Sequence, residues 1–126
     1  MKIIDTEAHF YTPDYHKYIN SRTEIPYEEQ YNDGLRLWYA PGVWEPHGDI
    51  IEDKLLDLGE NRLKEMEKAG VDMQVLSLST PGCEQFDPET GTKWSQRAND
   101  TLGEVIKKYP DRFVGLAALA PQDPAA

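Results

Sequence analysis

Apolar positions in the second half of the chain recur at helical spacing and predict two helices. Spacings of three and four residues predict a helix over residues 52–69, and Gly70 is suited to end it because glycine readily adopts the left-handed conformation. The same period predicts a second helix over residues 94–109, which Pro110 ends. The residues expected to face the core are Leu56, Gly59, Leu63 and Met66 in the first helix and Ala98, Leu102, Val105, Ile106 and Tyr109 in the second.

Three short apolar runs predict strands, over residues 2–6, 71–79 and 113–119. The later two are apolar on both faces, which is typical of parallel strands that are covered on both sides. Because strands alternate with helices, the chain is expected to be α/β, with βαβ units and right-handed crossovers. Active sites of such folds lie at the carboxyl ends of the strands, so we expect the residues that follow each strand to meet at one rim.

The segment between the first strand and the first long helix, about residues 11–49, has no clear period and is expected to be a long loop. A short helix is expected after Pro13-Asp14, and Asn32-Asp33-Gly34 predicts a turn. Residues 11–54 hold six of the 7 tyrosines, and disordered segments are poor in aromatic residues. The aromatic side chains either wall a pocket over the end of the first strand, or pack against their own domain or a partner subunit. They are Tyr11, Tyr15, Tyr18, Trp38, Tyr39 and Trp44.

Composition and charge narrow the classes of function. The net charge of −10 and the isoelectric point near 4.6 argue against a surface for nucleic acid or anionic membrane. The sequence has no apolar run near the roughly 18 residues of a membrane span, and its N-terminus lacks the pattern of a signal peptide. A cytoplasmic protein is therefore expected. The single cysteine, Cys83, excludes an intramolecular disulfide framework and is expected to be an ordinary thiol.

A carboxylate and an imidazole, Glu7 and His9, follow the first strand. Residues two apart in an extended chain project to the same side, so the two side chains are expected to point together at one spot. Both are ligands that a divalent cation such as Zn²⁺ or Mn²⁺ accepts. The alternative is an exposed glutamate beside a hydrogen-bonded histidine, because this short motif recurs by chance.

Four other polar residues have simpler expected roles. The two remaining histidines, His16 and His47, lie in the loop and are expected to be surface residues rather than metal ligands. Asn99 and Asp100 lie near the expected start of the second long helix, where capping and first-turn charge account for them.

Three strands and two crossovers cannot close a barrel, which normally takes eight strands and about 250 residues. Apolar character on both strand faces requires cover on both sides. We therefore expect residues 1–126 to be the N-terminal part of a single larger domain, or to assemble with other chains.

The chain resembles the amidohydrolase-related metal-dependent decarboxylases. This family includes the 2,3-dihydroxybenzoate, γ-resorcylate and 5-carboxyvanillate decarboxylases and, more distantly, aminocarboxymuconate-semialdehyde decarboxylase. The resemblance covers nearly the whole chain except the aromatic loop. It is carried by Glu7-Ala8-His9-Phe10; by Asp57-Leu58-Gly59-Glu60, Arg62-Leu63, Ala69-Gly70-Val71 and Leu76-Ser77-Leu78-Ser79-Thr80-Pro81-Gly82; and by Arg97-Ala98-Asn99-Asp100-Thr101-Leu102, Tyr109-Pro110-Asp111-Arg112-Phe113 and Ala120-Pro121-Gln122-Asp123-Pro124.

The resemblance implies a (β/α)₈ TIM barrel, of which this chain would form about three βα units with a long aromatic-rich loop after strand one. It implies one divalent metal ion, Zn²⁺ or Mn²⁺, with Glu7 and His9 matching the first two ligands of the family. The family's other ligands, a histidine and an aspartate, and its acid–base histidine come from later strands, so the catalytic residue is unknown here. The isolated chain is expected to be inactive.

The expected activity of the whole protein is non-oxidative decarboxylation of a small aromatic acid that bears an ortho hydroxyl group. Phe10, Thr80 and Pro81 are candidate substrate-pocket residues, although a structural turn is the favoured interpretation for Thr80 and Pro81. Two alternatives stay open: a metal-dependent hydrolase of a lactone or amide on the same scaffold, and a non-catalytic assembly module. A homo-oligomer is expected, and a second chain is a further possible source of the rest of the barrel.

Overall fold

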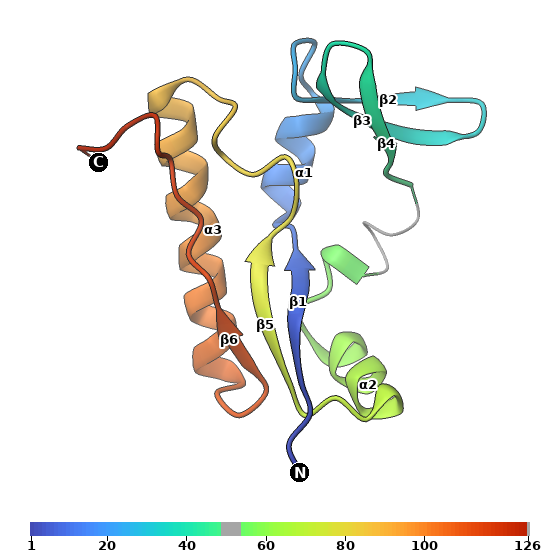
Figure 1. Ribbon diagram of the computed structural model, residues 1–126, viewed down its shortest axis with the longest axis vertical. Helices are drawn as coiled ribbons and strands as arrows, with labels where there is room; N and C mark the ends of the chain where they lie inside the picture. Colours follow the sequence, from blue (N-terminus) through green and yellow to red (C-terminus); the bar gives the residue numbers. More distant parts are fainter. Residues whose placement is uncertain (49–53, 126) are drawn as a thin grey trace.

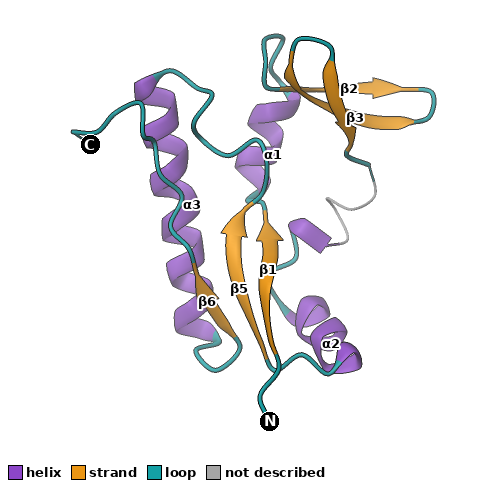
Figure 2. Cartoon of the chain, in the orientation of Figure 1, coloured by secondary structure: helices purple, strands orange, loops and turns teal. Residues whose placement is uncertain are grey.

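Two small sheets organise the computed structural model, which describes residues 1–48 and 54–125 (Figure 1, Figure 2). The first sheet contains β1 (Ile4–Phe10), β5 (Met73–Leu78) and β6 (Phe113–Gly115) in the order β1-β5-β6, and both strand pairs are parallel. The predicted α/β class with parallel strands is therefore confirmed. The remaining elements are α1 (Pro13–Asn20), β2 (Tyr27–Tyr31), β3 (Gly34–Ala40), β4 (Val43–Pro46), α2 (Glu60–Ala69) and α3 (Pro88–Lys108). None of the helices in the described ranges is long and apolar enough to cross a lipid bilayer.

The parallel sheet is packed on the side of the long helices. Ala8 and Phe10 of β1 project into one hydrophobic core, which residues of α2 and α3 complete. Both helices lie beside the parallel sheet (Figure 1). The other buried members of this core are Met66, Leu76, Ala98, Leu102 and Phe113. The helical residues Leu63, Val105, Ile106 and Tyr109 pack around it, as their spacing predicted.

The opposite face of the sheet is not covered by residues 1–48 or 54–125, so these residues do not supply the second cover that the apolar strands were expected to need. Phe113 is fully buried, and a side chain at Gly115 would collide with Leu102 of α3. Because side chains alternate along a strand, Val114 and Leu116 project the other way, and they are 39% and 59% exposed. The apolar character of these positions was read correctly, but their cover is not among the described residues.

The third strand is shorter than predicted, because the ladder stops at Gly115 instead of residue 119. Beyond it, Asn99 of α3 takes over the role of a neighbouring strand. Its side-chain amide donates to the carbonyl oxygen of Ala118 at 2.9 Å, and its side-chain oxygen accepts from the Ala118 amide at 2.8 Å. Asn99 therefore lies in the middle of α3 and binds the backbone of the segment after β6 to this helix. The expected capping role for Asn99 and Asp100 is wrong.

Both long helices begin elsewhere than their apolar periods indicated. Of the expected helix over 52–69, residues 52 and 53 lie outside the described residues, and α2 begins only at Glu60. The Asp57 carboxylate accepts from the amides of Gly59 and Arg62, both at 2.8 Å, and so fixes this start. The end at Gly70 is confirmed, with a left-handed φ of 70°.

Helix α3 begins six residues before the predicted Trp94. Asp87 caps it by accepting from the Thr90 amide at 3.0 Å, and Pro88 occupies the first turn. The pair Asp87-Pro88 is typical of a helix start, but the apolar period of the helix does not extend back to these residues.

The expected long loop over residues 11–49 is wrong for most of its described length. It contains helix α1, which was predicted, and an antiparallel sheet in the order β2-β3-β4, which was not. The predicted turn at Asn32-Asp33-Gly34 joins β2 to β3 as a hairpin. Residues 27–31 and 34–40 were not recognised as strands because their polar and apolar residues do not alternate cleanly.

The aromatic residues of this segment divide between two places. Tyr11 and Tyr15 are fully buried in a second core with Ile19 and Leu37. For these two tyrosines, the structure therefore agrees with the interpretation that the aromatic side chains pack against their own domain. The remaining buried members of this core are Cys83, Phe86 and Trp94, with Tyr18 and Tyr39 packed against it. Tyr27, Trp38 and Trp44 instead lie next to one another across the three antiparallel strands.

Candidate metal centre

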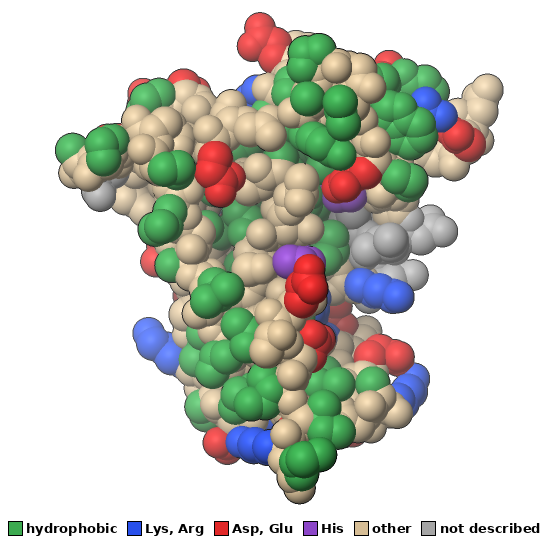
Figure 3. Space-filling model, viewed as in Figure 1, with side chains coloured by type: hydrophobic (Ala, Val, Ile, Leu, Met, Phe, Trp, Pro, Cys, Tyr) green, Lys and Arg blue, Asp and Glu red, His purple; other side chains and the backbone are tan. Residues whose placement is uncertain are grey.

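Glu7 and His9 lie within the last four residues of β1 and not beyond its end, because the strand runs four residues further than the predicted residues 2–6. Both are exposed, whereas Ala8 between them is buried in the helix-side core. Alternation therefore places the two side chains on the uncovered face, as expected from their spacing. In Figure 3 a histidine and acidic side chains lie together on this side of the molecule.

A bulge in β1 sets the position of Glu7. Thr6 and Glu7 together lie opposite the single residue Val75, since the register shifts between Asp5 and Ala8. The Asp5 carboxylate accepts from the Glu7 amide at 3.2 Å and from the Gln74 side chain at 3.0 Å. Bulges redirect side chains and often occur beside active sites. Asp5 therefore stabilises the backbone turn that aims Glu7 outward.

His9 is held at both its ring and its backbone. Its Nδ1 lies 2.9 Å from Oγ of Ser77, the residue directly opposite it on β5. Its carbonyl oxygen accepts from Nη2 of Arg62 at 2.8 Å. The same guanidinium donates to the carbonyl oxygens of Asp57, at 2.6 Å, and Lys54. Burial lowers the pKa of Arg62 from its ordinary value, although the guanidinium stays charged at any physiological pH.

The donor set suits part of a divalent-metal site. A carboxylate and an imidazole with Nε2 directed away from its Ser77 contact are two acceptable ligands. Over residues 1–48 and 54–125, no group of three or more histidine, cysteine, aspartate or glutamate side chains is arranged so that it could hold a metal ion. Tight binding normally takes three or four ligands. Glu7 and His9 therefore fit a metal ion that draws further ligands from elsewhere.

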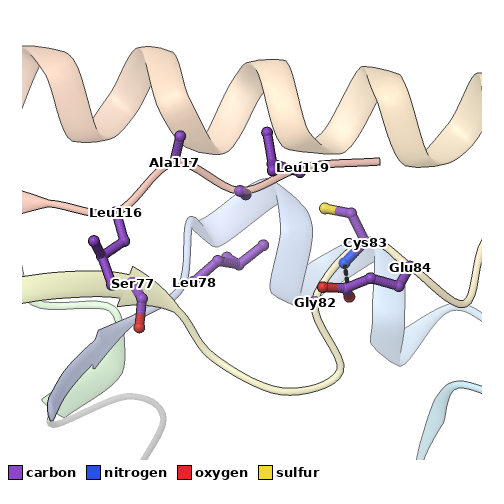
Figure 4. A pocket seen from close by; sticks show the side chains of 9 residues that line it. Ser77, Leu78, Gly82, Cys83, Glu84, Leu116, Ala117 and Leu119 are labelled. Carbon is purple, nitrogen blue, oxygen red and sulfur yellow. Dashed lines mark hydrogen bonds between the residues drawn. The ribbon is translucent and has the colours of Figure 1, made fainter. Parts of the chain in front are cut away.

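Two cavities flank these residues. One of about 450 Å³ runs between β1 and α2, and Glu7, His9 and Arg62 belong to its lining. The other, of about 240 Å³, lies at the carboxyl ends of β5 and β6, where Ser77 and Leu116 form one end (Figure 4). Ser77 lines the second cavity and contacts a residue of the first, so it lies between the two.

Cys83 and Glu84 lie at the far end of the smaller cavity (Figure 4). The Glu84 carboxylate accepts from the backbone amide of Cys83 at 2.9 Å. Burial, followed by the charge of Glu84, raises the pKa of the Cys83 thiol to about 12. The thiol is therefore protonated at neutral pH and is no nucleophile.

The three candidate pocket residues occupy different environments. Phe10 is only 1% exposed and packs in the helix-side core, away from the face of Glu7 and His9. Thr80 and Pro81 form a turn after β5, in which the Thr80 carbonyl oxygen accepts from the Tyr11 hydroxyl. Thr80 is exposed and Pro81 buried. The structural role in a turn thus accounts for both, and Phe10 is a core residue.

A buried cluster of polar groups was missed entirely. His47 is 5% exposed, and its Nδ1 lies 2.9 Å from Oε1 of Glu28, which is also 5% exposed. Nε2 of His16 lies 3.0 Å from the other Glu28 oxygen, and Nε2 of His47 lies 3.1 Å from the Tyr11 hydroxyl. The expectation that His16 and His47 are surface residues is therefore wrong. They come from α1 and from the residue after β4, and Glu28 of β2 brings them together.

The electrostatics of this cluster favour an ionised carboxylate. Burial alone would raise the pKa of Glu28, but the hydrogen bonds and charges of His16 and His47 outweigh it and lower that pKa below its ordinary value. Burial, then the charge of Glu28, raises the pKa of Tyr11 far above its usual range. Tyr11 is therefore a neutral hydrogen-bond donor to Thr80, at the point where β1 and β5 end.

Comparison with known proteins confirms the similarity that the motifs indicated. No family model matches the chain. Over 90 residues the chain is 40% identical to a γ-resorcylate decarboxylase of Rhizobium sp. (strain MTP-10005), an alignment that covers 70% of this chain and 26% of that protein. The chain thus spans about a quarter of the length of the curated relatives it matches.

Solved structures place the same fold in decarboxylases. The 5-carboxyvanillate decarboxylase of Sphingomonas paucimobilis is 34% identical, with a TM-score of 0.76 over 98% of this chain and 36% of that one. A 5-carboxyvanillate decarboxylase of Novosphingobium aromaticivorans is also 34% identical, with a TM-score of 0.74 over 98% of this chain and 35% of that one. That structure contains manganese and 3-methoxy-4-hydroxy-5-nitrobenzoic acid.

Proposed function

We propose that the protein containing this chain catalyses metal-dependent, non-oxidative decarboxylation of an aromatic acid with a hydroxyl group ortho to its carboxylate. One observation carries this proposal: Glu7 and His9 lie together on the uncovered face, near the carboxyl end of β1. The similarity to γ-resorcylate and 5-carboxyvanillate decarboxylases supports the substrate class. Manganese in one of these structures favours Mn²⁺ over Zn²⁺.

In this proposal Glu7 and His9 hold the metal ion. When bound, a divalent cation there supplies a Lewis acid that chelates the substrate carboxylate and the adjacent oxygen. Val114 and Leu116 project from the same face and offer apolar surface to an aromatic ring. Decarboxylation also requires a general acid that protonates the ring carbon as CO₂ leaves, and we assign that role to no residue of this chain.

We further propose that the chain forms about three βα units at the N-terminal end of a (β/α)₈ barrel. The parallel order β1-β5-β6, the single covered face and the exposed Val114 and Leu116 support this arrangement. Intact mass of the purified protein under denaturing conditions tests it. A mass well above 14.4 kDa is expected; a mass equal to that of this chain would require a second polypeptide or refute the barrel.

The activity test uses the protein at its full natural length, loaded with Mn²⁺ and incubated with a panel of ortho-hydroxybenzoates that includes γ-resorcylate and 5-carboxyvanillate. We expect stoichiometric release of CO₂ from at least one of them, and loss of that release in Glu7→Gln. If no hydroxybenzoate loses CO₂ while a lactone or amide is opened, the protein is a hydrolase and the proposal fails. If neither reaction occurs with metal bound, the assembly role gains support.

We also propose that the protein is a homo-oligomer that uses the outer face of the antiparallel sheet. Trp44 is 39% exposed there, beside the stacked Tyr27 and Trp38. Light scattering after gel filtration should give a mass that is a multiple of one subunit. Trp44→Lys should reduce this mass if the face is the interface, and a monomeric wild-type protein would refute the proposal.

A further inference from the structure

We propose that Ser77 is a positioning residue that holds His9 ready to bind the divalent cation. Its hydroxyl oxygen accepts a hydrogen bond from Nδ1–H of His9, which leaves the Nε2 lone pair free for the metal. This inference rests on the metal site proposed above. It concerns the orientation and tautomer of one ligand, and it can be measured in the metal-free protein.

The strand register makes the contact a property of the fold. His9 and Ser77 are direct partners in the parallel pair β1·β5, 68 residues apart in sequence. Residues directly opposite each other in paired strands project to the same face. Strand β5 is the central strand, and its ladder with β1 continues past Ser77 to the pair Phe10 and Leu78, so the backbone of Ser77 is fixed. Its Oγ therefore stands at a fixed place, 2.9 Å from Nδ1 of His9.

The contact between His9 and Ser77 decides which ring nitrogen of His9 can bind a metal ion. A neutral imidazole carries one proton, and only the other nitrogen can bind a metal ion. A serine oxygen has two lone pairs and accepts readily. If Nδ1 donates to Ser77, Nε2 is the free donor atom of His9. Hydrogen bonds of this kind, from the second ring nitrogen to a neighbouring group, set the tautomer and orientation of metal-binding histidines.

The backbone of His9 is fixed independently of its ring. The carbonyl oxygen of His9 accepts from Arg62 at 2.8 Å, and the Nη1 of Arg62 also lies 3.3 Å from the Gln74 side-chain oxygen. With the main chain held by Arg62 and the ring by Ser77, His9 has little freedom left to lose when it binds a cation. Pre-ordered ligands bind more tightly because that entropy loss is avoided.

The test compares Ser77→Ala, Ser77→Thr and Ser79→Ala in the full-length protein. Ser77→Thr retains the hydroxyl, and Ser79 lies just beyond the end of β5 as a matched control. The first readout is the ¹⁵N chemical shifts of His9 in the metal-free protein. We expect Nδ1 protonated in the wild type, in Ser77→Thr and in Ser79→Ala, and the tautomer mixture of a solvent-exposed imidazole in Ser77→Ala.

The second readout is Mn²⁺ affinity, titrated by electron paramagnetic resonance. Ser77→Ala should weaken binding about 10- to 100-fold, and Ser77→Thr should restore most of it. A wild-type His9 that is protonated mainly on Nε2, or unchanged Mn²⁺ affinity in Ser77→Ala, overturns the inference. If Mn²⁺ binds and depends on Ser77 but no substrate loses CO₂, the proposed reaction fails and this inference stands. If no metal binds to the wild type, both fail.

Discussion

Nδ1 of His47 lies 2.9 Å from Oε1 of Glu28 in a place where both residues are almost fully buried. The Tyr11 hydroxyl donates to the carbonyl of Thr80, so its oxygen is free to accept from Nε2 of His47. The contact between His47 and Glu28 therefore links the antiparallel sheet to Tyr11, directly after β1. The antiparallel sheet β2-β3-β4 is therefore held next to the carboxyl end of β1 by these polar contacts as well as by the core that contains Tyr11 and Tyr15.

Removing the charge of Glu28 should destabilise the protein strongly. Glu28→Gln replaces the buried carboxylate that His16 and His47 contact with a neutral amide, and breaking one partner of such a buried pair costs about 3 kcal/mol. The free energy of unfolding in urea measures the effect. Glu29→Gln, on the exposed side of the same strand, is the control and should change it by less than about 0.5 kcal/mol. Equal effects of the two variants would show that the contacts of the Glu28 carboxylate with His16 and His47 contribute nothing to stability.

The same carboxylate predicts how stability varies with pH. The pKa of Glu28 in the folded protein lies below its ordinary value of 4.5. Its contribution is therefore complete above pH 4.5 and is lost as the pH falls through the lowered pKa of the folded state. The difference in unfolding free energy between wild type and Glu28→Gln should shrink steadily below pH 4.5. A difference that stays constant down to pH 2 would contradict this account.

Asn99 should matter for stability although it lies within a helix. Asn99→Ala leaves the amide and the carbonyl of Ala118 without their present partners. Two lost hydrogen bonds to a partly buried backbone should lower the free energy of unfolding by about 1–3 kcal/mol. Asp100→Ala, its exposed neighbour on α3, is the matched control. Faster hydrogen exchange at Ala118 in Asn99→Ala alone would identify the cause, and protection equal to the wild type would exclude it.

Metal removal should abolish activity reversibly. Dialysis against a chelator is expected to remove CO₂ release completely, and added Mn²⁺ should restore it, since the cation supplies the Lewis acid. Glu7→Gln should lower kcat/KM by a factor on the order of 10² or more, because a neutral amide is a poor ligand for a divalent cation. Glu104→Gln, an exposed acid in α3, should leave kcat/KM unchanged. Full activity of the chelated enzyme would rule out a catalytic metal.

The sequence alone determined the features that depend on neighbours along the chain. The helical period, the Gly70 stop and the Asn32-Asp33-Gly34 turn each follow from residues within a few positions. The placement of Glu7 and His9 on one side of a strand has the same origin, because alternation is a local property of extended backbone. These features gave the α/β class, the parallel strands and the candidate metal ligands.

Tertiary structure decided whatever depends on residues far apart in sequence. Glu28 is buried because His16 and His47 converge on it from two other elements. Ser77 reaches His9 only through the register of β1 against β5. Neither contact can be predicted from the spacing of apolar residues in the sequence, since burial and register are set by long-range pairing and not by local conformational preference. The candidate metal ligands Glu7 and His9 were therefore visible in the sequence, whereas the residues that contact and orient His9 were not.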